Sequence, residues 1–263
     1  MFQKLTDTSY AVSAWSGGTT TQLAIIPPEA KYADRDFLWR VSSATVDLEE
    51  SDFTALPDYD RLIATLQGEI VLTHNGGVPI KLHPFEVHAF SGADATHSRG
   101  RCTDFNLMLR RGRAAGTMEA LRLTDAPTNL SVGTSIACPQ TSPASRGGGA
   151  PQRGAEEGYL PPEVPTAPAV GTSIACPPNA SEETLLLYCA EGSCTATVGA
   201  VETSPASRGG GAPQRGAEEG CCPQPAAAIP VSLRAGEALL LTDLMPLTLS
   251  GPATLMLCRI TAL

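Results

Sequence analysis

The sequence lacks a basic segment, and its formal charge at pH 7 is −9. Proteins that bind nucleic acids or anionic membranes present a net basic face, so we expect neither kind of partner. The sequence also has no apolar run that approaches the length of a membrane span, and we expect no embedded segment.

A signal peptide is also missing from the first residues, MFQKLTDTSYAVSAWSGG, which hold one lysine and no continuous apolar stretch. Disulfides are typical of secreted proteins, so the eight cysteines are expected to be reduced thiols. These features together predict a cytoplasmic protein.

Two strings of the sequence occur twice without a single change. TSPASRGGGAPQRGAEEG occupies 141–158 and 203–220, and VGTSIACP occupies 132–139 and 170–177. Structural repeats keep a hydrophobic pattern while their surface positions vary, but these copies are rich in Gly, Pro, Ser and Ala and have little to bury. We interpret them as low-complexity inserts at about 131–180 and 201–228.

A second, inexact repeat appears once the inserts are set aside. Residues 62–92 read as strand, turn, strand, turn, strand, and residues 185–199 followed by 229–251 read the same way. IKLHPFEVHAF aligns with VSLRAGEALLL, and FNLMLRR aligns with TLMLCRI. Cys189 and Cys194 are expected to face each other across a hairpin. The pattern predicts an all-β fold of two jelly-roll β-barrels, a bicupin, with modules at 1–112 and 113–263.

Four motifs follow one another in the first half: WSGGTTTQL at 15–23, FLWRVS at 37–42, LPDYDR at 56–61 and DFNLMLRR at 104–111. Together they resemble the HutD/Ves family, over about 1–125 well and over the second half more loosely. The resemblance implies a bicupin of RmlC-like cupin modules and a link to histidine utilisation. It implies a small-molecule binder or regulator and no established reaction.

Arg40 is the most informative polar residue. Positions 38, 40, 42, 44, 46 and 48 share one face of a strand that is mostly apolar, so Arg40 and Ser42 should point into the barrel. A buried arginine needs an anionic partner. That partner is either Asp104 or Glu69 in an internal ion pair, or the carboxylate of a ligand held by a bidentate clamp.

Other polar residues of the motifs complete the candidate ligand site. Arg61 supplies a second cation at the barrel mouth, or else a salt bridge at the rim with Asp58 or Asp60. Asp104 and Asn106 share a strand face and either orient a ligand or satisfy backbone groups at the strand end. The remaining candidates are polar groups of a strand and an aromatic wall that could equally belong to the core: Thr20, Gln22 and Trp15.

The histidine pattern of metal-binding cupins is missing, so we expect no metal and no cofactor. The nearest alternative set is Glu86, His88 and His97, which would have to converge in a metal-dependent isomerase, lyase or dioxygenase. No pair of nucleophile and base stands out. We therefore expect a non-catalytic protein that binds a small anionic metabolite of the urocanate or formylglutamate class, with exposed sheet edges that favour a homodimer.

Overall fold

The computed structural model describes residues 1–130, 172–174, 182–199, 228–242 and 245–263. Within these ranges the chain forms nineteen strands and two single-turn 3-10 helices, η1 (Asp7–Ser9) and η2 (Tyr32–Asp34), and no α-helix. The expected all-β class is confirmed. The inserts expected at about 131–180 and 201–228 lie outside the described residues, apart from 172–174 and 228.

Three sheets account for the strands, and none of them closes into a barrel within the described part of the chain. The six-stranded sheet has the order β2 (Ala11–Trp15), β3 (Gly18–Ile26), β4 (Trp39–Val46), β11 (Cys102–Arg110), β6 (Tyr59–Gln67), β9 (His88–Ser91). The four-stranded sheet has the order β5 (Glu50–Asp52), β10 (Thr96–Arg99), β7 (Ile70–His74), β8 (Ile80–Leu82).

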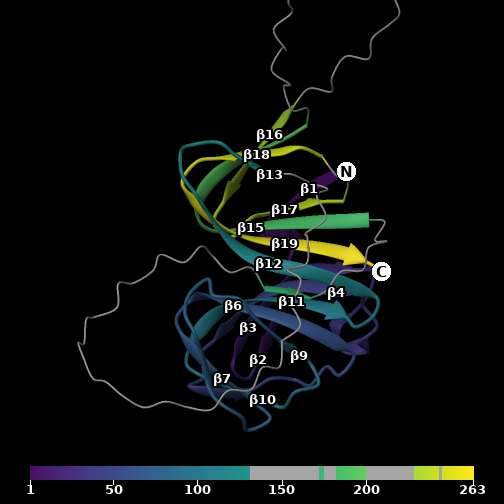
Figure 1. The fold of residues 1–263 in the computed structure, drawn as a ribbon, viewed down its shortest axis with the longest axis vertical. Helices are drawn as coiled ribbons and strands as arrows, with labels where there is room; N and C mark the ends of the chain where they lie inside the picture. The colour runs from purple at the N-terminus through teal and green to yellow at the C-terminus, as the bar shows by residue number, and fades with distance from the viewer. Residues whose placement is uncertain (131–171, 175–181, 200–227, 243–244) are drawn as a thin grey trace, which may run out of the picture.

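The nine-stranded sheet is built mainly from the second half of the chain. Its central order is β1 (Phe2–Leu5), β17 (Ala238–Leu241), β15 (Glu182–Val198), β19 (Ala253–Ala262), β12 (Ala114–Leu123), β14 (Thr172–Ile174). Its other members pair with β15 or with one another: β13 (Thr128–Leu130), β16 (Ile229–Arg234) and β18 (Leu247–Ser250). Figure 1 shows this group above the strands of the first half.

Strand alternation gives the six-stranded sheet two different faces. On β11, Phe105 and Leu107 belong to the largest core cluster, whereas Asp104 and Asn106 line a cavity on the opposite face. Successive side chains of a strand point to opposite faces, so one strand can serve a dry core and a polar site at once. On β4, the face carrying Arg40 lines the cavity, as the sequence predicts.

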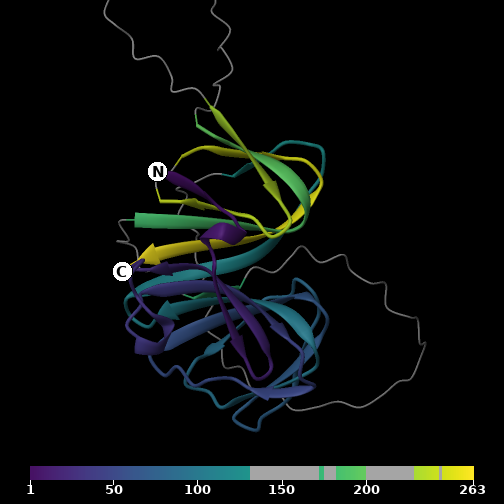
Figure 2. The same cartoon turned by 180° about the vertical axis from the view of Figure 1, so that it is seen from behind.

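The dry face joins the two groups of strands. Phe105 of β11 lies against Tyr188 of β15, with ring centroids 5.2 Å apart, and Leu186 and Met256 belong to the same buried cluster. Figure 1 shows β12 between β19 and the strands of the first half, and Figure 2 shows the same two groups from behind. The polar face of the six-stranded sheet therefore points away from the second group.

The two turns that the sequence alignment pairs have matching geometry. The backbone N–H of His83 donates to the Glu86 carboxylate at 2.9 Å, and that of Arg234 donates to the Glu237 carboxylate at 2.8 Å. The third residue of each turn is left-handed, with φ of 68° at Phe85 and 89° at Gly236. The alignment of IKLHPFEVHAF with VSLRAGEALLL therefore pairs equivalent positions.

One expected hairpin is wrong. Strand β15 runs continuously through the Ala-Glu-Gly-Ser segment, with only a register shift between Cys189 and Glu191 against β19. Cys189 and Cys194 therefore lie on the same strand and do not face each other across a turn; both are buried free thiols. The segment has the composition of a turn, but it forms a β-bulge, which also absorbs an extra residue.

The first strand crosses over to the second group. Strand β1 pairs with β17, with Phe2 opposite Leu241 and Leu5 opposite Ala238. Lys4 adds an ion pair to Glu237 at 2.7 Å. Among the described residues, no helix has the length and apolar character that a membrane crossing requires.

Candidate functional site

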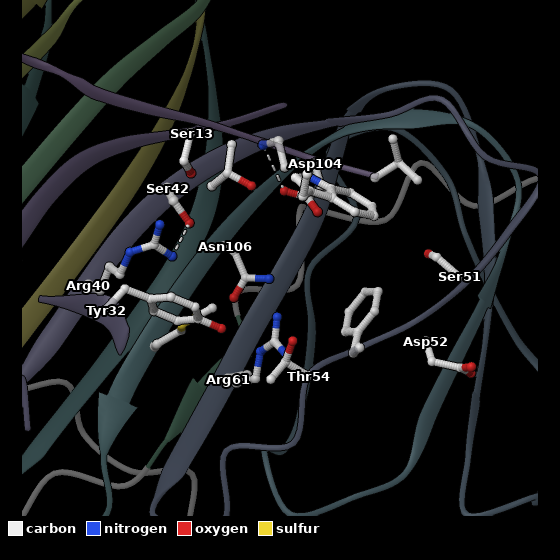
Figure 3. A pocket seen from close by; sticks show the side chains of 16 residues that line it. Ser13, Tyr32, Arg40, Ser42, Ser51, Asp52, Thr54, Arg61, Asp104 and Asn106 are labelled. Atoms are coloured by element: carbon white, nitrogen blue, oxygen red, sulfur yellow. Dashed lines mark hydrogen bonds between the residues drawn. The ribbon is translucent and has the colours of Figure 1, made fainter. Parts of the chain in front are cut away.

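Three adjacent strands bring the predicted polar residues to one cavity of about 300 Å³. β11 lies between β4 and β6, and the register places Met108 opposite both Arg40 and Arg61. Figure 3 shows Arg40, Arg61, Asp104 and Asn106 pointing into this space. Strand alternation, which predicted an inward direction for Arg40, therefore directs all four of these side chains into the cavity.

Arg40 is held in place by neutral groups. Its Nε donates to Gln22 Oε1 at 2.8 Å, its Nη1 donates to Ser42 Oγ at 3.0 Å, and its guanidinium lies 4.6 Å from the centre of the Tyr32 ring. The side chain is 5% exposed, and burial lowers its pKa. Gln22 does not line the cavity, but it orients the arginine that does.

The internal ion pair considered for Arg40 is not formed. Glu69 instead contacts Lys81 and His83 at the surface, and Arg40 has no ion-pair partner within the described ranges. The absence of an ion pair at Arg40 could not be predicted from the sequence, because a strand pattern shows which face a side chain occupies but not which group it contacts.

Arg61 is buried between two phenylalanines. Its guanidinium lies 4.9 Å from the centre of the Phe53 ring and 5.1 Å from that of Phe90, and the residue is 6% exposed. Its buried Nε has no hydrogen-bond partner within the described residues. Burial lowers the pKa of Arg61 to about 10. An unpaired buried cation is costly unless an anion reaches it.

The alternative of a rim salt bridge between Arg61 and Asp58 or Asp60 is wrong for the described residues. Asp60 pairs with Arg111 at 2.7 Å, and Arg61 has no ion-pair partner in the described part of the chain. Asp60 and Arg61 are successive residues of β6, so their side chains leave opposite faces of the sheet. Arg61 is consequently free to serve the cavity.

Asp104 and Asn106 provide the other polar groups of the cavity. Asp104 Oδ1 accepts a hydrogen bond from the Ala44 backbone N–H at 3.1 Å, so it does partly satisfy a strand backbone. Burial raises the pKa of Asp104 to about 6, against the opposing effect of Arg61, the Ala44 hydrogen bond and Arg40. Asn106 is 3% exposed, and its Oδ1 has no partner among the described residues.

The hairpin of β2 and β3 forms one side of the cavity mouth. Thr20 and Trp15 both line the cavity, and Trp15 is 41% exposed, so the alternative that it belongs to the core is wrong. A Cβ on Gly17 would lie 2.1 Å from the Trp15 ring. The glycine after Trp-Ser thus leaves room for the indole to fold over the turn.

This arrangement suits an anion. Two guanidinium groups face the same partly enclosed space, and hydroxyl and amide groups surround them. Guanidinium groups bind carboxylates through directed, charge-assisted hydrogen bonds. The cavity therefore has the chemistry to hold a small carboxylate.

Comparison with known proteins agrees with this architecture. The HutD family model matches residues 7–140, which include every candidate ligand residue. The chain belongs to the HutD family. No curated protein matches it in sequence.

Solved structures extend the likeness over the whole HutD-family chain. The conserved protein of unknown function PA5104 from Pseudomonas aeruginosa is 20% identical, with a TM-score of 0.59 and coverage of 100% of this chain and 98% of that one. HutD from Pseudomonas fluorescens is 16% identical, with a TM-score of 0.58 and full coverage of both chains. The nickel(II) complex of the bacterial pirin YhhW from Escherichia coli is 9% identical, with a TM-score of 0.52 and 98% coverage of each. At these identities the likeness shows a shared cupin-like β fold.

The alternative metal set of this HutD-family chain does not converge. Glu86 caps the turn at His83, His88 contacts His74, and His97 contacts Asp52 across β10 and β5. Among the described residues no three His, Cys, Asp or Glu side chains form a group that could hold a metal ion. The three candidates lie on β9, on β10 and in the turn before β9, each directed to a different neighbour.

Two residues that line the cavity, and a histidine pair outside it, escaped the sequence reading. Tyr32 lies in η2, and Phe53 follows β5, so the period of a strand reveals nothing about the direction of either ring. His74 and His88 meet Nε2 to Nε2 at 2.9 Å, and their rings lie 4.8 Å and 5.9 Å from that of Phe90. Only the alternation of β9, which puts His88 and Phe90 on one face, could have signalled that cluster.

Proposed function

We propose that this HutD-family protein binds a small carboxylate between Arg40 and Arg61. The observation that carries the proposal is the presence of two buried guanidinium groups in one cavity, neither with an ion-pair partner in the described structure. A protein that gained only stability from this interior would do better with apolar residues. An anionic ligand that neutralises Arg40 and Arg61 would explain why both buried cations are present.

The ligand class follows from the groups around the two cations. The cavity volume of about 300 Å³ suits a metabolite of a few carbon atoms, and the amide of Asn106 and the hydroxyl of Thr20 offer neutral hydrogen bonds. Urocanate and formylglutamate combine a carboxylate with further polar groups and connect the site to histidine utilisation, the role that the family resemblance implies. We propose this class as the ligand.

Binding without catalysis completes the proposal. Among the described residues that line the cavity, no hydroxyl forms a hydrogen bond with a side-chain carboxylate or an imidazole, which favours a sensor or regulator. We further propose that the three sheets correspond to two cupin modules at about 1–112 and 113–263, with β1 of the first joining the sheet of the second, and that only the first module binds ligand. A cytoplasmic location and a homodimer formed through exposed sheet edges belong to the same proposal.

Isothermal titration calorimetry and thermal shift with urocanate, formylglutamate, histidine and acetate test the proposal. A ligand that binds the folded state raises its melting temperature by mass action, so millimolar concentrations reveal even weak binding. We expect saturable binding of a carboxylate that a chelator does not alter. Loss of two charge-assisted hydrogen bonds in Arg61→Gln should weaken binding roughly 100-fold or more.

The matched control is Arg101→Gln, which removes an exposed arginine paired with Glu49 outside the cavity. Its affinity should equal that of the wild type. If none of the four compounds binds at millimolar concentration, or if Arg101→Gln weakens binding as much as Arg61→Gln does, the proposed function is wrong.

A further inference from the structure

Asp104 is the one acidic side chain among the buried residues of the described structure. It is 8% exposed, it comes from the strand between those of Arg40 and Arg61, and it lines the cavity with both. Yet it forms an ion pair with neither arginine. Its one hydrogen bond is accepted from the Ala44 backbone N–H at 3.1 Å.

The position of Asp104 gives the empty cavity a partial charge balance. Both guanidinium groups lower the pKa of this carboxyl, so they attract its negative charge, although burial opposes ionisation more strongly. A ligand carboxylate that enters the same cavity competes with Asp104 for the same two cations. Two carboxylates in one buried site raise each other's pKa, because like charges disfavour ionisation.

We propose that Asp104 is an internal counter-anion whose place a ligand carboxylate takes, and that Asp104 binds one proton from solvent as the ligand binds. The inference rests on the proposed function. Once protonated, Asp104 has an O–H that can donate a hydrogen bond to the bound carboxylate, whereas the ionised form can only accept. The site then selects a ligand that enters as an anion and binds while Asp104 carries a proton.

Titratable groups on several elements surround Asp104, and Asp52 of β5 also lines the cavity. Arg40 on β4 and Arg61 on β6 favour its ionised form. Cys102, on the same strand, titrates with its pKa raised to about 12 and stays neutral at pH 7. Tyr32 in η2 faces the two arginines.

His74 is another group that could take up a proton, since Arg61 lowers its pKa and its ring lies 4.8 Å from that of Phe90. The test must therefore separate Asp104 from the histidine.

The expected linkage has a definite sign. With a pKa of about 6, Asp104 is mostly ionised at pH 7 in the free protein. If ligand binding raises this pKa, Asp104 takes up nearly one proton per site at pH 7. At pH 5 it takes up almost none, because the free protein already carries the proton. The affinity is then level below about pH 6 and falls by up to about tenfold per pH unit above it.

Calorimetry with N-formylglutamate measures the uptake directly. This probe has no group that titrates between pH 5 and pH 8, so any proton taken up belongs to the protein. Titrations at pH 7 in PIPES and in Bis-Tris, which differ in ionisation enthalpy, give the number of protons bound per ligand. We expect close to one in the wild type.

Asp104→Asn is the decisive variant, because the amide resembles the protonated acid. We expect uptake near zero, an affinity independent of pH between 6 and 8, and binding at pH 8 at least tenfold tighter than in the wild type. Glu69→Gln removes an exposed carboxylate paired with Lys81 and should bind with the same proton uptake as the wild type.

Each other result has its own meaning. Binding without proton uptake in the wild type overturns the inference and leaves the proposed function standing, and this measurement needs no variant. Uptake that persists in Asp104→Asn assigns the proton to another group, His74 first, and also overturns it. Absence of any saturable carboxylate binding removes both the inference and the proposed function.

Discussion

The imidazoles of His74 and His88 meet end to end. Their Nε2 atoms are 2.9 Å apart and their ring centroids 5.1 Å apart, which is close to the Nε2 separation plus the two ring radii. The rings therefore share one N–H···N hydrogen bond and do not overlap face to face. His74 Nδ1 also lies 2.8 Å from Thr96 Oγ1, which can donate to the Asp94 carbonyl at 3.3 Å. This network favours a proton on His74 Nδ1 and places the shared proton on His88.

Acid should break this histidine pair. Burial lowers the pKa of both residues below the ordinary 6.5, and each is further lowered by a neighbouring group, Arg61 for His74 and His74 for His88. The unfolded chain thus binds more protons below pH 6.5, and the stabilisation is lost as pH falls through the folded values. In urea melts, His88→Gln should cost about 1 kcal/mol at pH 7.5 and less at pH 5.

His97→Gln, which removes a surface contact with Asp52, is the control for that experiment. An exposed pair of this kind contributes between about 0 and 1 kcal/mol. Equal pH dependence in the two variants would contradict the paired arrangement of His74 and His88.

Ionised Asp104 should destabilise the folded protein. Its carboxyl titrates at about 6 when folded against 3.8 as the reference, so the folded state binds more protons between these values. Raising the pH through this window therefore lowers the free energy of unfolding. We expect Asp104→Asn to gain stability relative to the wild type from pH 4 to pH 7, by about 2–3 kcal/mol in total. Urea melts at four pH values measure the difference, and a constant difference would refute the raised pKa.

Arg61→Met should abolish carboxylate binding and raise the free energy of unfolding. The methionine keeps an apolar side chain next to Phe53 and Phe90 and removes a buried charge that has no ion-pair partner among the described residues. We expect the free energy of unfolding to rise by about 1–3 kcal/mol while carboxylate binding disappears. A variant that is both less stable and still able to bind would show that the guanidinium has a structural role only.

Tyr59→Phe should weaken the fold without touching the cavity. The buried Tyr59 hydroxyl donates toward the Phe37 carbonyl at 2.8 Å or the Arg35 carbonyl at 3.0 Å, and accepts from Arg110 Nη1 at 3.2 Å. Its removal leaves buried groups unpaired and should lower the free energy of unfolding by about 1–3 kcal/mol. Ligand affinity should stay at the wild-type value, and loss of affinity would place Tyr59 in the binding machinery.

The sequence predicted the inward polar residues because strand alternation is a local property. Knowing that Arg40 shares a face with Ser42, and Asp104 with Asn106, requires only the strand, and three adjacent strands then deliver these groups to one cavity. Partners were harder to predict, since Glu69, offered for Arg40, pairs with Lys81 instead. Partner choice depends on the relative placement of strands far apart in the chain.

The errors in β15 and the omission of the ring contacts have related causes. The Ala-Glu-Gly-Ser segment has turn residues, but the long strand of which it is part continues through a β-bulge and pairs with β19 on both sides of it. Phe53 and Tyr32 lie outside the long strands, where no period constrains the side chain. A single sequence shows neither that a strand continues through a bulge nor which way a ring outside a strand points.

The pairing of β1 with β17 joins residue 2 to residue 241, two positions far apart in the chain. During synthesis β1 has to wait until β17 has emerged before the two can pair, whereas the hairpin of β2 and β3 can close much earlier. Until then both β1 and the edge of β17 remain unpaired and open to other chains. Completion of the nine-stranded sheet therefore depends on a pairing between segments far apart in the chain, and a substitution that weakens β1 would leave an edge of β17 open to other chains.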